Sequence, residues 1–147
     1  MRHLHLYSYL CTFLVFIILG PIVGYFVFYY KITGGSPLHG ANIHEVVIDA
    51  FQIGMLPAAT TGLLFYPAYQ TAKRILQRYA LPINGPLGFL VGAALGATVL
   101  PIWFSKLYFG VFHTTETEKF ILMASALLGG MLGYISVKLA AIINKPN

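Results

Sequence analysis

Hydrophobic residues in this chain are gathered into long stretches that contain no Lys, Arg, Asp or Glu. These four stretches cover residues 3–30, 50–72, 79–105 and 120–137. A helix needs about 20 apolar residues to cross the roughly 30 Å hydrocarbon core of a bilayer. Because a soluble domain does not require four such runs, the pattern predicts a polytopic membrane protein.

Local signals at the ends of these stretches predict helices joined by short loops. The four expected helices cover about residues 7–30, 43–69, 86–105 and 116–143. Asn42 and Thr115 each lie three residues before a glutamate, which is the spacing of an N-terminal capping box. We therefore expect one all-α transmembrane domain, a bundle of four helices over residues 1–147, with no room for a second domain.

Prolines within and beside the stretches predict where the helices bend and begin. Pro57, Pro67 and Pro101 each remove a backbone donor and free a carbonyl one turn earlier. We expect kinks near the middle of the second helix and at the outer end of the third. Asn84-Gly85 predicts a turn before the third helix, with Pro86 in its first turn.

The charged residues flank the stretches and predict the orientation of the chain. Composition supports membrane residence, with 58% hydrophobic and 9% charged residues and a net charge of +5. Six of the nine basic residues fall on one side of the membrane: Arg2, Lys73, Arg74, Arg78, Lys138 and Lys145. All four acidic residues fall on the other side. By the positive-inside rule both termini are expected in the cytoplasm, and because the basic residues do not form a clustered stripe, no nucleic-acid partner is expected.

Small residues four positions apart mark one face on each of three helices. The set is Gly54, Ala58 and Gly62, then Gly88, Gly92 and Gly96, then Gly129 and Gly133. Small side chains let the backbones of membrane helices approach closely, so these eight residues are the predicted helix-packing site. The pattern fits packing within one bundle, and it also fits a face that meets a partner protein or another copy.

Polar residues form a stripe on the second helix. Glu45, Asp49 and Gln52 fall within one narrow arc, which makes them the candidate polar or ion site. Asp49 lies about one turn past the helix start, where an acid complements the helix dipole and can simply anchor the outer interface. An acid inside a membrane span is also a candidate for proton or cation handling.

Signals for catalysis and cofactors are missing from the sequence. His44-Glu45 begins like a zinc-protease motif, but Ile48 stands where the second histidine is needed. No nucleotide-binding glycine pattern occurs, and the single cysteine, Cys11, has no partner in the chain. We therefore expect no metal site, no cofactor and no enzymatic activity.

The functional expectation is a small protein of a bacterial inner membrane that acts through helix–helix packing. It would be a non-enzymatic accessory, assembly or immunity-type subunit, with the lipid bilayer and a membrane-protein partner or a homo-oligomer as its contacts. The alternative is a small oligomeric carrier or channel for protons or cations that uses Glu45 and Asp49.

Overall fold

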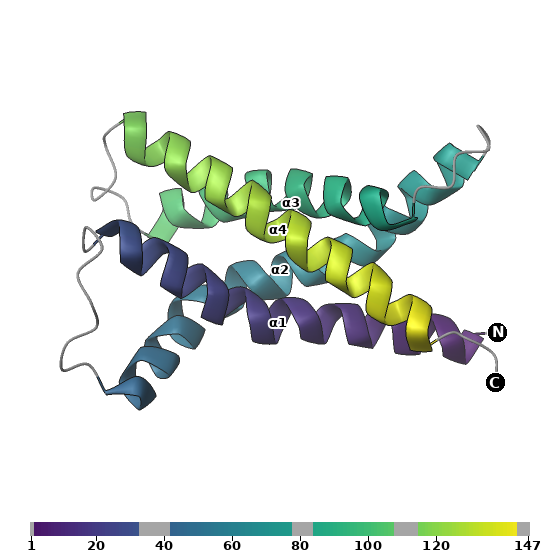
Figure 1. Ribbon diagram of the computed structural model, residues 1–147, viewed down its shortest axis with the longest axis horizontal. Coiled ribbons are helices and arrows are strands. Elements are labelled where there is room, and N and C mark those ends of the chain that lie inside the picture. The colour runs from purple at the N-terminus through teal and green to yellow at the C-terminus, as the bar shows by residue number, and fades with distance from the viewer. Residues whose placement is uncertain (1, 33–41, 78–83, 108–114, 144–147) are drawn as a thin grey trace.

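The computed structural model describes residues 2–32, 42–77, 84–107 and 115–143 of the chain. These residues form α1 (Arg2–Ile32), α2 (Ile43–Gln77), α3 (Asn84–Leu107) and α4 (Thr115–Ile143), with no strand among them (Figure 1). The predicted all-α class is confirmed for this part of the chain.

Each helix is longer than the sequence predicted, chiefly α1 and α2. Since Lys73, Arg74 and the residues up to Gln77 are good helix formers, α2 continues through them, and the basic side chains complement the negative end of the helix. α3 begins at Asn84, so the expected turn at Asn84-Gly85 is wrong. Pro86 is tolerated there because a backbone N–H in the first turn has no intrahelical acceptor.

The predicted cap at the start of α2 is present. The side-chain Oδ1 of Asn42 accepts a hydrogen bond from the backbone N–H of His44 at 3.2 Å. The carbonyl of Asn42 accepts the first helical bond from the N–H of Val46 at 3.1 Å. Asn42 is therefore the N-cap residue, and its side chain satisfies a donor that the helix itself leaves open.

The helices form a ring in which each packs against its sequence neighbours and α4 packs against α1. Contacts within the α1–α2, α1–α4 and α3–α4 pairs show that the two helices of each of these pairs are antiparallel. Gly20 lies beside Ala58 and Gly54 beside Pro21, while Gly24 lies beside Leu128 on α4. As a result, the start of α1 and the end of α4 lie at the same end of the bundle, drawn in purple and yellow in Figure 1.

An aromatic cluster fills the middle of the ring. Phe65 is 1% exposed, and its ring lies 5.2 Å from that of Phe16 and 5.9 Å from that of Tyr69, measured between centroids. Leu87 on α3 and Leu132 on α4 belong to the same buried cluster. Side chains from all four helices therefore meet around Phe65, and their packing fixes how the helices sit together.

The predicted kink in α2 is present as a bend of 52° between the segments His44–Gln52 and Gly54–Gln77. Pro57 lies inside the helix four residues after Ile53, whose carbonyl it leaves without its usual donor. The hydroxyl of Thr61 donates to the carbonyl of Pro57 itself at 2.8 Å, one turn further along the helix. We call residues 44–52, which precede the bend, the α2 arm.

Three of the helices contain stretches long and apolar enough to cross a membrane, and the bent α2 makes a fourth if its two segments form one span. Large apolar side chains cover the outside of the bundle, among them Leu90, Met123 and Ile142, each more than 60% exposed. A water-soluble monomer rarely exposes apolar surface this extensive. The helices thus indicate a membrane protein.

Candidate functional site

The glycines of α3 and α4 face one another at the closest helix contact in the bundle. A Cβ placed on Gly92 would collide with the carbonyl oxygen of Gly129, and a Cβ placed on Gly129 would collide with that of Gly92. The glycine Cα–H groups that replace those side chains point at the carbonyls, in the arrangement of Cα–H···O contacts between closely packed helices. The two backbones touch, which no larger residue would permit.

The same contact extends to both sides of this pair. A Cβ on Gly88 would lie 2.9 Å from the carbonyl oxygen of Gly133 and 2.7 Å from Cγ2 of Val137. Gly96 faces the carbonyl of Ser125. All five predicted packing residues of α3 and α4 therefore lie in one continuous seam between these two helices.

The small residues of α2 lie against α1. A Cβ on Gly54 would lie 2.8 Å from the Cα of Pro21, so the bend of α2 sits directly on a proline of its neighbour. One turn further on, a Cβ on Gly20 would lie 3.2 Å from the Cβ of Ala58. A Cβ placed on Gly62 would lie 3.0 Å from the Cβ of Phe16, so Gly62 packs directly against that side chain. The structure thus places all eight predicted packing residues inside this bundle rather than on its outer surface.

Several close contacts were missed by the sequence analysis. Gly130 lies under the ring of Phe89, with a would-be Cβ 2.7 Å from its Cε2, and Pro21 is fully buried. Gly130 does not belong to the spacing of four that predicts the packing residues, but it follows Gly129 directly and gives α4 a second closely packed face. Ser125 and Ser136 on α4 are fully buried, and among the described residues neither hydroxyl has a hydrogen-bond partner.

The polar stripe on α2 faces outward. Glu45, Asp49 and Gln52 are all exposed, while Val46 and Ala50 form the buried side of the same arm. Thr60, which continues the stripe beyond the bend, donates its hydroxyl to the carbonyl of Leu56 at 2.9 Å. The three candidate site residues therefore share one side of the arm and are presented to whatever surrounds the bundle.

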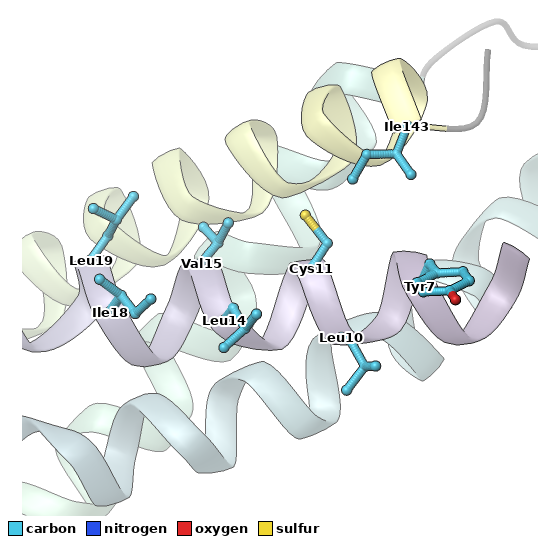
Figure 2. A pocket seen from close by; sticks show the side chains of 8 residues that line it. All are labelled: Tyr7, Leu10, Cys11, Leu14, Val15, Ile18, Leu19 and Ile143. Carbon is cyan, nitrogen blue, oxygen red and sulfur yellow. The ribbon is translucent and has the colours of Figure 1, made fainter. Parts of the chain in front are cut away.

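An apolar groove runs along α1 near the end of α4. It is an open, shallow groove of about 590 Å³, and seven of its eight lining residues come from α1, with Ile143 as the one from α4 (Figure 2). Cys11, the single cysteine, lines this groove and is half-buried. Its walls contribute almost no polar surface, so the groove suits a hydrocarbon ligand better than a polar one.

Within the described residues, no three His, Cys, Asp or Glu side chains are grouped closely enough to hold a metal ion. His39 and His113, which the sequence places on the same side as Glu45, lie outside those residues. No protein-family model matches this sequence, and neither a curated protein nor a solved structure matches it.

Proposed function

We propose that this chain is a four-span protein of a bacterial inner membrane and serves as a non-enzymatic accessory, assembly or immunity-type subunit. Its termini lie in the cytoplasm, as the distribution of basic residues favours. The observation that carries the proposal is the outward presentation of Glu45, Asp49 and Gln52 on the α2 arm. A carrier formed by one copy would instead need these groups inside the bundle.

The length of α2 supports a position of its arm at the outer headgroups of the membrane. Its 35 residues would extend about 52 Å if straight, far more than the roughly 30 Å hydrocarbon core. The uncharged part after the bend, residues 54–72, covers about 28 Å and is sufficient to cross. The α2 arm then lies at the outer headgroups, where its acids stay hydrated and its exposed side is open to another protein.

The contacts that the small residues make inside the bundle favour partner binding at the arm. Because the glycine faces hold the four helices to one another, a partner has to meet other surfaces of the bundle. The side of the arm that carries Glu45, Asp49 and Gln52 also exposes the neighbouring apolar side chain of Ile48. Such a mixed surface is typical of a protein–protein contact at the edge of a membrane.

A gentle-detergent pull-down from native membranes tests the proposal when it is combined with two tryptophan substitutions. Gln52→Trp places bulk on the arm and should abolish a stoichiometric association that the unmodified chain retains. Met131→Trp is the matched control, since Met131 is also exposed but lies on α4. Equal association of both variants would contradict binding at the arm, and the absence of any stoichiometric partner would contradict the accessory role.

The alternative, an oligomeric carrier or channel, requires copies to face one another through the exposed stripe. A Cys11→Ser, Asp49→Cys variant distinguishes the two, because oxidation should cross-link copies only if position 49 of one copy meets position 49 of another. We expect no cross-link, since two Asp49 carboxylates facing each other would repel. A cross-linked dimer combined with ion flux would favour the carrier.

A further inference from the structure

The α2 arm is held to the bundle much less firmly than the segment that follows it. Among residues 44–52 only Val46 and Ala50 are buried. The segment after the bend contributes the large rings of Phe65 and Tyr69 to the buried core. The start of the arm and the end of α1 also stand apart (Figure 1). A segment with few buried apolar contacts opens at low cost, so the arm can move while the rest of α2 stays in place.

The segment after the bend is fixed where it meets α1. A Cβ on Gly54 would lie 2.8 Å from the Cα of Pro21, and Pro21 is fully buried. No side chain separates the two helices at this level, so Gly54 is held directly against the backbone of α1. The boundary between the fixed and the loosely packed part of α2 therefore falls between Gln52 and Gly54, where the helix bends by 52°.

The backbone at this boundary lacks a hydrogen bond that resists bending. Pro57 has no N–H, so the carbonyl of Ile53 has no donor within the helix. The helix continues on both sides of this position, which concentrates the bending at one level. A freed carbonyl one turn before a proline, with a glycine beside it, is typical of a helix hinge.

We propose that the α2 arm swings as one helical body about Ile53 and Gly54, so that its angle to the rest of α2 varies. Ile48 precedes Ile53 by about 8 Å along the helix, and a swing equal to the 52° bend moves it by about 7 Å. The swing needs no partner. In the accessory role proposed above, a partner that binds the arm selects one of its angles, and only this consequence rests on the proposed function.

Distances between pairs of spin labels, measured by pulsed electron paramagnetic resonance on the full chain in lipid nanodiscs, test the swing. In a Cys11→Ser chain, the labels are attached through Ile48→Cys on the arm and Met131→Cys on α4, the helix opposite α2. Leu64→Cys with Met131→Cys is the matched control, because Leu64 follows the bend and is exposed like Ile48 (46% against 41%). We expect the distance distribution from Ile48 to be wider than the control by about 5 Å. Equal widths would overturn the proposal.

A matched pair of proline substitutions locates the hinge. Pro57→Ala returns an N–H to the turn that follows Ile53, so the distribution measured from Ile48 should narrow to the width of the control. Pro67→Ala should leave it wide, because Pro67 lies in the same helix beyond the bend. The distance from Leu64 to Met131 should stay the same in both variants, which shows that the bundle is intact. If the distribution stayed wide in Pro57→Ala, the motion would not arise at this bend.

The buried edge of the arm provides a second measurement that leaves both prolines in place. Val46→Ala removes one of the two buried side chains of the arm and should widen the distribution from Ile48 further. Val47→Ala is the control, since Val47 is 40% exposed against 8% for Val46. Equal distributions for the two variants would contradict a swinging arm. Because no partner is present, a wide distribution in a chain that retains no partner would support the hinge and remove only the accessory role.

Discussion

Gly133 on α4 lies against the ring of Phe65 on α2, so that a Cβ added at Gly133 would come within 2.7 Å of Phe65 Cε2. These helices stand opposite each other in the ring and are not neighbours. Phe65 reaches across the centre because Gly133 has no side chain to occupy it. One aromatic residue thereby connects the two halves of the bundle.

Replacing Phe65 by alanine should therefore destabilise the bundle strongly. A buried phenylalanine contributes about 3–5 kcal/mol relative to alanine, since the substitution removes contacts and leaves a cavity. Leu64→Ala is the control, because Leu64 is 46% exposed on the outer surface. The unfolding midpoint in mixed detergent should fall for Phe65→Ala and barely change for Leu64→Ala. Similar losses for both would contradict the central role of Phe65.

The seam between α3 and α4 should not accept any side chain at Gly92. Even Gly92→Ala is expected to cost about 1–3 kcal/mol, because its methyl group would meet the carbonyl of Gly129, and Gly92→Leu should cost more. Ala94→Leu, at an exposed position of the same helix, should have little effect. The measurement is thermal stability in detergent. A Gly92→Leu protein with unchanged thermal stability would contradict the close packing of α3 against α4.

Removing the buried hydroxyl of Ser136 should be neutral or stabilising. Its Oγ has no hydrogen-bond partner within the part of the chain that the structure describes, so a buried hydroxyl is left unsatisfied there. Ser136→Ala is expected to raise the unfolding midpoint slightly. Thr61→Val provides the contrast, because the Thr61 hydroxyl donates to Pro57 at the bend and its loss should lower stability. A destabilised Ser136→Ala variant would mean that the hydroxyl has a partner in the membrane.

Asp49→Asn separates the two functional classes. The amide keeps the shape of the exposed side chain and removes its charge. Because Glu45, Gln52 and the apolar side chains of the arm are unchanged, a packing protein should lose at most a dipole contact of about 0.3–1 kcal/mol and still retain its partner. A proton- or cation-coupled carrier would lose ion dependence while staying folded. We expect the first outcome in a combined pull-down and flux assay. A folded variant that has lost flux would establish the carrier instead.

Reporter fusions test the proposed orientation. Fusions after Tyr79 and at Asn147 should report the cytoplasm, whereas a fusion within residues 34–40 should report the opposite side. These positions lie outside the described residues, so the expectation depends on charge alone. A cytoplasmic signal from residues 34–40 would reverse the orientation and would place the α2 arm on the cytoplasmic side.

The helices and the bend in α2 could be predicted from local sequence. The length of an uncharged stretch predicts a helix, Asn42 predicts the start of α2, and Pro57 predicts its bend, because each of these acts within a single helix. The partners of the glycines could not, since spacing alone does not say that Gly92 meets Gly129 or that Gly54 meets Pro21. The outward direction of Asp49 depends likewise on which side of α2 faces α1. The groove requires Ile143 to lie beside α1, a relation between distant parts of the chain that no local pattern contains.

The close backbone contacts have a consequence for how the protein enters a membrane. Gly54 meets Pro21 within the α1–α2 pair, and Gly92 meets Gly129 within the α3–α4 pair. Each pair is a helical hairpin whose tightest contact involves only its own two helices, so the chain can insert as two consecutive hairpins. The second hairpin then docks on the first by packing Leu87 and Leu132 around Phe65, so the buried core that joins all four helices is completed last.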